Sequence, residues 1–185
     1  MRIIGGRFRN KRLSSPRDQS VRPTSERARE ALFNILDHAG LIESARFLDL
    51  FSGSGAVGLE AWSRGAEEVW LIDRDIALAN TNVEAIGRPS AVHVRRLDAT
   101  DLGRAPCRFD VAFLDPPYRS GLAGPALEGL DRGWLADDAL VVLELAAKDQ
   151  LDLPPGFEVE QDRHHGAARL LFLRSGRSAA EAEPS

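Results

Sequence analysis

The sequence predicts an α/β fold in which a mostly parallel sheet carries helices on both faces and ends in an antiparallel hairpin. From residue 46 onward, short apolar runs alternate with stretches of helical periodicity. Strands that alternate with helices are typical of parallel sheets. The last two apolar runs are instead separated only by a short segment containing His164-His165-Gly166, which favours a hairpin.

The expected elements follow one another along the chain. The expected strands are 47–51, 69–72, one containing 92–94, 109–114 and 140–145, followed by the hairpin strands 157–161 and 169–173. The expected helices of this region are 56–64, 75–86 and one near 122–131. An earlier helix is predicted because Ala28, Leu32, Ile35 and Leu36 share one face, with Thr24 or Ser25 as its cap.

The two ends of the chain differ from the centre. Residues 2–13 hold two short apolar patches around Gly5-Gly6 and predict a small β-hairpin, and residues 14–23 are polar with two prolines. The last residues lack aromatic and branched apolar side chains, which predicts disorder. We therefore expect a basic N-terminal hairpin and loop at 1–23, one domain at 24–174 and a disordered tail at 175–185.

The composition is that of an ordinary soluble protein. Of 185 residues, 43% are hydrophobic and 28% charged, and the apolar runs are far too short to span a membrane. The N-terminus has no apolar segment typical of a secretory signal. Cys107, the single cysteine, excludes an intramolecular disulfide and is expected to be a packing or surface residue. We expect a cytoplasmic protein.

The charge is distributed unevenly. The net charge is −4, but residues 1–30 sum to +6, so the remainder sums to −10. A basic segment on an acidic body predicts an anionic partner, nucleic acid first, although a solvated basic tail remains the plainer alternative.

A glycine loop follows the first expected strand. The stretch DLFSGSGAVG places Asp49 in the strand and Gly53, Gly55 and Gly58 after it. Glycines at a strand-to-helix turn permit positive φ and close approach of a ligand to the backbone, while a simple tight turn is the alternative.

Acidic residues end the neighbouring strands. Asp73 follows Gly53 by twenty residues, the spacing at which an acid takes ribose hydroxyls, and Asp75 is the better candidate for a helix cap. Asp98 follows the third strand, so Asp49, Asp73 and Asp98 are expected around one crevice. Such a site suits a cationic ligand with hydroxyls, such as S-adenosylmethionine.

The stretch Asp115-Pro116-Pro117-Tyr118 ends the fourth strand beside the same crevice. Two prolines stiffen the turn and need no N–H partner, so backbone carbonyls can point into the site, where Asp115 and a carbonyl can accept both protons of a planar amine. Tyr118 offers a ring for stacking on a base. The alternative is a helix-starting turn with Tyr118 in the core.

These segments together resemble S-adenosylmethionine-dependent amino-group methyltransferases that carry an Asp/Asn-Pro-Pro-Tyr/Phe motif. RPTSERAREALFNIL, LDLFSGSGAVGLEAWSRGA, FLDPPY and GWLADDALVVLE resemble the bacterial family that methylates N2 of a guanine in 16S ribosomal RNA, over roughly residues 2–173. The resemblance implies a Rossmann-like class I methyltransferase fold, a seven-stranded sheet with a reversed hairpin at its edge. It implies action on RNA of the small ribosomal subunit or its assembly intermediate, by a protein that we expect to be monomeric.

The resemblance also implies roles for individual residues. The implied cofactor residues are Asp49, Phe51, Gly53, Gly55, Asp73, Asp98 and Ala99. Those that hold the target amine and its base are Asp115, Pro116, Pro117 and Tyr118. Those expected to meet RNA are Arg7, Arg9, Lys11 and Arg12 of the basic segment, with Arg22, Thr24 and Arg27 of the family's N-terminal segment.

Two other classes of function stay open at this point. The chain could methylate DNA adenine or a protein glutamine amide, or it could be an inactive ribosome-assembly protein that retains the fold. No metal site is expected, because the histidines and Cys107 lack ligand spacing. Trp62 and Trp134 are expected in the core, and Glu144 is unusual inside an apolar strand because a buried carboxylate needs a partner.

Overall fold

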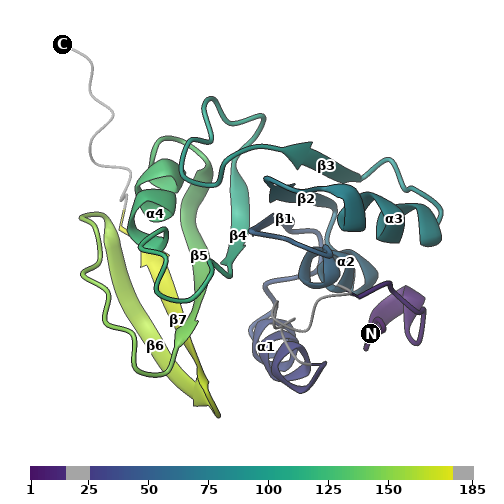
Figure 1. The fold of residues 1–185 in the computed structure, drawn as a ribbon, viewed down its shortest axis with the longest axis horizontal. Coiled ribbons are helices and arrows are strands. Elements are labelled where there is room, and N and C mark those ends of the chain that lie inside the picture. The colour runs from purple at the N-terminus through teal and green to yellow at the C-terminus, as the bar shows by residue number, and fades with distance from the viewer. Residues whose placement is uncertain (16–25, 177–185) are drawn as a thin grey trace.

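The computed structural model describes residues 1–15 and 26–176. Its centre is a seven-stranded sheet in the order β3-β2-β1-β4-β5-β7-β6 (Figure 1). Strands β1 to β5 pair in parallel, whereas β7 pairs antiparallel with both β5 and β6. The predicted parallel sheet with an antiparallel C-terminal hairpin is confirmed.

The elements have the following bounds. The strands are β1 (Arg46–Leu50), β2 (Glu68–Asp73), β3 (Val92–Arg96), β4 (Phe109–Leu114), β5 (Leu135–Ala146), β6 (Phe157–His165) and β7 (Ala168–Ser175). The helices are η1 (Gly6–Phe8, a 3-10 turn), α1 (Glu26–His38), α2 (Ala56–Ser63), α3 (Ala77–Ala85) and α4 (Ala123–Asp131).

Two hydrophobic layers cover the two faces of the sheet. Alternate residues of β1 point to opposite faces, so Phe47 packs with the core of α1, α2 and α3, while Leu48 packs with that of α4. Trp134 is 1% exposed in the α4 layer and Trp62 is 7% exposed in the other, as predicted. None of the helices in the described part of the chain is long and apolar enough to cross a membrane.

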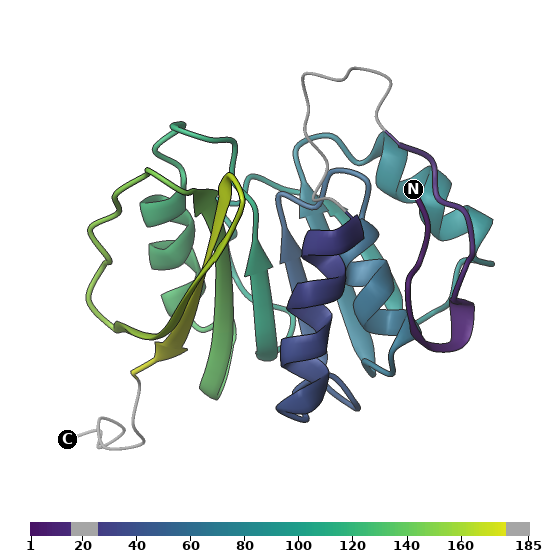
Figure 2. The same ribbon diagram turned by 90° about the horizontal axis from the view of Figure 1, so that it is seen from below.

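Residues 1–15, which we call the arm, are packed against the domain. The arm lies beside α2 and α3 (Figure 2), and its Ile3 and Leu13 belong to the core of the α1–α3 face. All eight residues of α2 are buried, which agrees with a helix whose side chains are apolar except for Glu60 and Ser63. The arm therefore shares the core of the domain.

Three expected boundaries are corrected by the structure. The arm pairs with itself around η1 as the predicted hairpin would, through the antiparallel bridge of Arg2 with Arg12 and backbone hydrogen bonds of Ile3 with Asn10 and Lys11, but its two sides are too short to form regular strands. β5 begins at Leu135 and not at Leu140, because Leu135 pairs with Phe109 before a register shift. The polar residues between Leu135 and Leu140 interrupt the apolar pattern from which the strand was predicted. β7 extends to Ser175, one residue into the expected tail, and residues from 177 onward lie outside the described part.

Candidate active site

The candidate site lies where the strand order reverses, between β1 and β4. In open α/β sheets ligands bind at such a point, beyond the carboxyl ends of the strands. The glycine loop leaves β1 there and the Asp-Pro-Pro-Tyr turn leaves β4. The N–H of Asp115 donates to the carbonyl of Leu50 at 3.4 Å, so the two predicted segments are neighbours.

The glycine loop is built for close approach. Phe51, Gly53 and Gly55 all have positive φ, at 60°, 51° and 72°. A Cβ on Gly53 would meet nothing nearer than a backbone oxygen at 4.0 Å, so this face of the loop is open. A Cβ on Gly58 would stand 2.3 Å from Leu71, so that glycine lets α2 approach β2. Positive φ at the non-glycine Phe51 stores strain of the kind found at ligand sites.

Asp49 supports this loop from beneath. Its side chain is buried, and its carboxylate accepts the N–H of Gly58 at 2.9 Å. Burial raises the pKa of Asp49 to about 7. We expected Asp49 to border the crevice, but its carboxylate is turned toward the start of α2 and away from solvent.

Asp73 and Asp98 are the accessible acids. Asp73 accepts the N–H groups of Gly53 at 2.8 Å and of Asp75 at 3.0 Å, so the end of β2 is tied to the loop. Asp98 accepts hydrogen bonds from Arg74 and Thr100, which lower its pKa to about 2. Asp73 is thus held at the loop, and Asp98 lies at the end of the neighbouring strand β3.

Two of the smaller predictions are refined. The side chain of Ala99 is 3% exposed and packs in the α4 layer, so only its backbone is left to meet a ligand. The carboxylate of Asp75 accepts the N–H of Ala77 at 3.0 Å, so it satisfies a free N–H at the start of α3, although the N-cap position itself is Ile76 and not Asp75 as predicted.

The Asp-Pro-Pro-Tyr turn carries the exposed aromatic ring that a base would need. Tyr118 is 39% exposed, which excludes the alternative of a core tyrosine. Its hydroxyl donates to the carboxylate of Glu144 at 3.4 Å. Glu144 is 5% exposed on β5 and follows Leu143, which pairs with Leu114 of β4. Glu144 therefore lies beside Asp115, the first residue after β4. The unusual carboxylate inside β5 therefore belongs to this site.

The basic residues expected to meet RNA divide into two groups. Arg7 donates to the carbonyl of Trp62 at 3.0 Å and lies over its ring at 4.8 Å, so it holds the arm in place. Arg9, Lys11, Arg12 and Arg27 are exposed. Arg22 and Thr24 lie outside the described residues.

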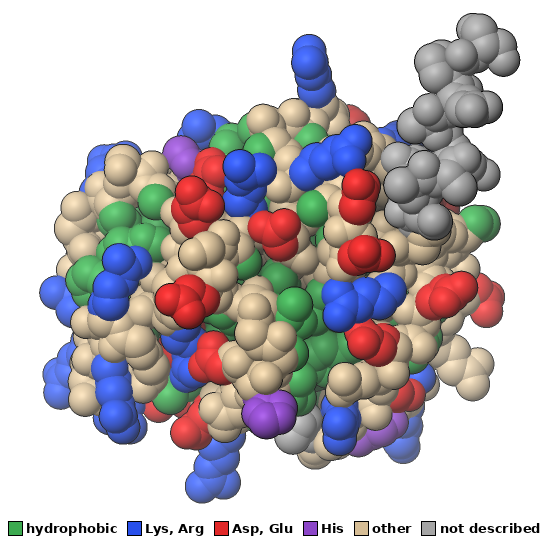
Figure 3. Space-filling view, turned by 180° about the vertical axis from the view of Figure 1, so that it is seen from behind, with side chains coloured by type: hydrophobic (Ala, Val, Ile, Leu, Met, Phe, Trp, Pro, Cys, Tyr) green, Lys and Arg blue, Asp and Glu red, His purple; other side chains and the backbone are tan. Residues whose placement is uncertain are grey.

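Surface charge favours the arm as the contact for a polyanion. Arg9 and Arg27 border a hollow of about 310 Å³ between the arm and α1, which Glu26 and Glu30 also line. On the face opposite to that of Figure 1, acidic and basic side chains are interspersed (Figure 3).

Across the described ranges no group of histidine, cysteine and acidic residues could hold a metal ion.

Three buried polar residues were missed by the sequence analysis. Arg29, Glu60 and Asn82 are at most 1% exposed, and all three contact the arm. Glu60 lies in the otherwise apolar stretch AVGLEAWS, and a charge in such a place was the available signal. Arg29 and Asn82 lie in helices of mixed composition, where nothing in the sequence distinguishes them.

The comparisons with known proteins agree with this geometry. The family model described as Conserved hypothetical protein 95 matches residues 1–174. The chain belongs to this family. Among relatives, Ribosomal RNA small subunit methyltransferase D of Escherichia coli K12 is 35% identical over 99% of this chain and 94% of its own length. The protein of the same name in Haemophilus influenzae is 32% identical over 90% and 89%.

Solved structures give the same result for this member of the Conserved hypothetical protein 95 family. A putative methyltransferase of Escherichia coli matches with a TM-score of 0.83 and 33% identity, over 95% of this chain and 97% of that one. A putative methylase of Haemophilus influenzae matches with a TM-score of 0.75 and 30% identity, over 94% and 97%. The chain has the class I methyltransferase fold and is a methyltransferase.

Proposed function

We propose that this enzyme transfers the methyl group of S-adenosylmethionine to the exocyclic N2 amine of a guanine in 16S ribosomal RNA. The observation that carries the proposal is the placement of the Asp-Pro-Pro-Tyr turn against the glycine loop, through the Asp115 to Leu50 hydrogen bond. A turn that accepts a planar amine thus lies beside a loop suited to a nucleoside-like cofactor.

The residues of the crevice fit this cofactor. Gly53 gives an open backbone face, and Asp73 and Asp98 supply carboxylates at the ends of β2 and β3. Carboxylates suit ribose hydroxyls and a ligand that carries positive charge. When bound, S-adenosylmethionine supplies a methyl group activated by its attachment to a positively charged sulfur.

The turn acts on the amine by orienting it. The lone pair of an aromatic amine is spread into the ring, which makes the nitrogen a weak nucleophile. Two acceptors, Asp115 and a backbone carbonyl of the turn, would hold both amine protons and concentrate charge on nitrogen. Tyr118 would stack on the base. The cofactor would supply the methyl group to the amine nitrogen and leave as neutral S-adenosylhomocysteine, and the proton that the amine loses would pass to Asp115 or to water.

RNA is the favoured substrate class because of the arm. Exposed Arg9, Lys11, Arg12 and Arg27 supply positive charge at one side of an acidic protein, and two relatives are named as small-subunit ribosomal RNA methyltransferases. The target guanine must be unstacked to reach Tyr118. We infer a cytoplasmic monomer that meets the small subunit or its assembly intermediate.

Asp115→Ala tests the role of the turn. We expect methyl transfer to small subunits lacking the modification to fall by about 100-fold or more, since one aligned electrostatic contact is worth that much. The dissociation constant of S-adenosylhomocysteine should change little. The control is Asp110→Ala, an exposed acid of β4 that bonds the N–H of Arg46. Unchanged transfer by Asp115→Ala would refute the proposed role.

A further inference from the structure

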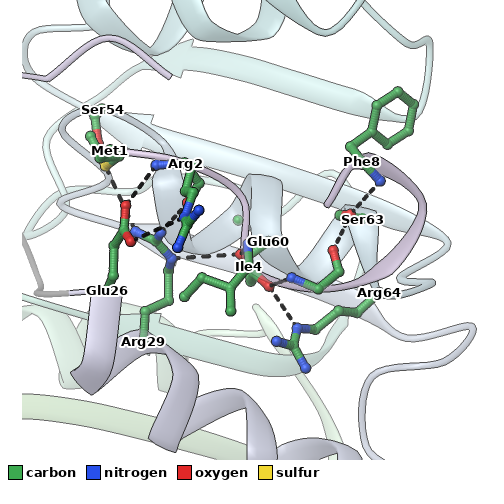
Figure 4. Close-up of polar contacts among 12 residues, drawn as sticks. Met1, Arg2, Ile4, Phe8, Glu26, Arg29, Ser54, Glu60, Ser63 and Arg64 are labelled. Atoms are coloured by element: carbon green, nitrogen blue, oxygen red, sulfur yellow. Dashed lines mark hydrogen bonds and ion pairs between the residues drawn. The ribbon is translucent and has the colours of Figure 1, made fainter. Parts of the chain in front are cut away.

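The arm is fastened to the domain by buried polar side chains. The carboxylate of Glu60, on α2, accepts the N–H groups of Ile4 and Gly5, both at 2.7 Å (Figure 4). The same carboxylate accepts Nε of Arg64 at 2.7 Å and lies 3.6 Å from Nε of Arg29. Arg29 in turn donates to the carbonyl of Arg2. The fully buried carboxylate of Glu60 thus binds two backbone N–H groups of the arm as well as the two arginines.

Two glycines make this contact possible. A Cβ on Gly6 would stand 1.9 Å from the carbonyl oxygen of Ser63, and one on Gly5 would stand 2.6 Å from the Arg64 guanidinium. The hydroxyl of Ser63 donates to the carbonyl of Gly5 at 2.6 Å and accepts the N–H of Phe8 at 2.9 Å. The arm backbone is therefore fitted closely to the end of α2.

A second fastening reaches the cofactor loop. Asn82 of α3 is 0% exposed. Its Oδ1 accepts the N–H of Ser14 at 2.7 Å, and its Nδ2 donates to the carbonyl of Ser14 at 3.1 Å. The same Nδ2 donates to the carbonyl of Ser54 at 2.9 Å. Ser54 lies between Gly53 and Gly55, so one amide joins the end of the arm to the centre of the glycine loop.

We propose that Asn82 is a positioning residue that couples the arm to the cofactor loop, so that cofactor binding orders the arm and RNA bound to the arm tightens cofactor binding. The identities of the two ligands rest on the proposed function. Asn82 touches neither ligand. The carbonyl of Ser54 and both backbone groups of Ser14 bond the same buried side chain. Because Asn82 is shielded from solvent, loss of either partner leaves a buried polar group unsatisfied, and this cost couples the two segments.

Coupling of this kind is reciprocal. If one ligand raises the affinity for the other by some factor, the second must raise the affinity for the first by the same factor. Ordering of the arm by a ligand held in the loop is then observable without RNA, through slower exchange of its backbone hydrogens.

Hydrogen exchange of residues 1–15 with and without S-adenosylhomocysteine tests the proposal. In the wild type we expect the ligand to slow exchange of the arm amides, including Ile4, Gly5 and Ser14. In Asn82→Ala this slowing should disappear, although the variant binds the ligand at saturating concentration. Asn80→Ala is the matched control, because its Nδ2 bonds only the carbonyl of Ile76 in its own helix. A circular-dichroism melt establishes that each variant is folded.

Ser14→Pro gives a second test that leaves Asn82 itself in place. It removes the N–H that Oδ1 of Asn82 accepts, and the side chain of Ser14 is exposed. We expect the same loss of ligand-induced protection as in Asn82→Ala. Arm exchange that does not respond to the ligand in the wild type, or that slows in both variants as much as in the wild type, would overturn the proposal. Failure of the enzyme to methylate RNA would overturn the proposed function and leave this result standing.

A binding experiment with RNA measures the coupling itself. We expect a fragment of small-subunit RNA to lower the dissociation constant of S-adenosylhomocysteine by about 5-fold or more in the wild type, the lower end of common coupling factors. In Asn82→Ala the ratio should approach one. A ratio that is the same in wild type and variant would contradict coupling through Asn82.

Discussion

The hydroxyl of Tyr118 donates a hydrogen bond to the buried carboxylate of Glu144, across 3.4 Å. Glu144 lies inside β5, beside the point where Asp115 follows the end of β4, and adjacent strands are about 4.8 Å apart. The hydroxyl of the exposed Tyr118 is therefore held by a residue of the sheet. We infer that Glu144 orients the ring on which the target base would stack.

Loss of this hydrogen bond should weaken activity without abolishing it. We expect Tyr118→Phe to lower kcat/KM by about 10-fold, which corresponds to about 1.4 kcal/mol, because the ring stays but its orientation is released. Tyr118→Ala should lose more, since stacking of one base on an aromatic ring is worth about 1–3 kcal/mol. Steady-state kinetics on small subunits measures both.

The partner residue provides the control. Glu144→Gln keeps an acceptor and should resemble the wild type more closely than Glu144→Leu does. The double variant Tyr118→Phe with Glu144→Leu should be no worse than the poorer single variant, because both remove one interaction. Fully additive losses would show that the two residues act separately.

Gly58→Ala should destabilise the fold, since its Cβ would stand 2.3 Å from Leu71 and 2.9 Å from Val69 in a packed core. We expect the free energy of unfolding to fall by about 1–3 kcal/mol, as for overpacking elsewhere. Gly129→Ala in α4 is the matched control, because its Cβ would meet nothing nearer than 3.6 Å. That change should be neutral or stabilising by about 0.5–1 kcal/mol. Urea unfolding measures both, and equal effects would contradict the packing described.

The buried Asp49 should make stability depend on pH. Its pKa is raised from 3.8 to about 7, so the folded state holds the proton more tightly than the unfolded chain does. Stability from this residue is present in full below about pH 4 and is lost as pH rises from there to about 7.

Asp49→Asn should remove this slope while keeping an acceptor for the N–H of Gly58. The stability of the variant relative to the wild type should therefore increase between pH 5 and pH 8, as measured by urea unfolding at each pH. Asp110→Asn, an exposed acid, should show no such trend. A relative stability that stays constant over this range would mean that the folded protein ionises Asp49 without cost, and it would contradict the raised pKa.

Exposed basic residues of the arm should set the salt dependence of RNA binding. Replacing one of Arg9, Lys11 or Arg12 with Gln should reduce the slope of log K against log salt by up to about 1 per lost phosphate contact. Arg132→Gln, exposed just after α4, should leave the slope unchanged. Binding titrations at several salt concentrations measure this, and equal slopes for all variants would place RNA elsewhere.

The strands and the site loops were readable from the sequence because their signals are local. The run 109–114 became β4 with the predicted bounds, since it is apolar and ends at Asp115-Pro116. The start of β5 was hidden because Asp137 and Asp138 interrupt the apolar pattern while the backbone still pairs with β4. The apolar periodicity of a sequence depends on its side chains, whereas the pairing of strands depends on backbone hydrogen bonds.

The buried polar residues could not be read in the same way. Asn82 is one of two asparagines in α3, and only the tertiary structure shows that it meets Ser14 and Ser54 while Asn80 bonds its own helix. The arm was expected to be an appended hairpin. Its packing against α2 was missed because those contacts join residues more than 50 positions apart, which no local sequence pattern shows. Glu144 stood out by composition, but its partner Tyr118 lies 26 residues away, in the turn that follows β4.

The central claim is that this enzyme methylates a guanine amine of small-subunit RNA, and the chemical identity of the product tests it most directly. Small subunits that lack the modification would be incubated with enzyme and radiolabelled S-adenosylmethionine, and their RNA digested to nucleosides. Our account predicts label in N2-methylguanosine with the wild type and none with Asp115→Ala. Label in N6-methyladenosine, or no transfer to RNA at all, would contradict it.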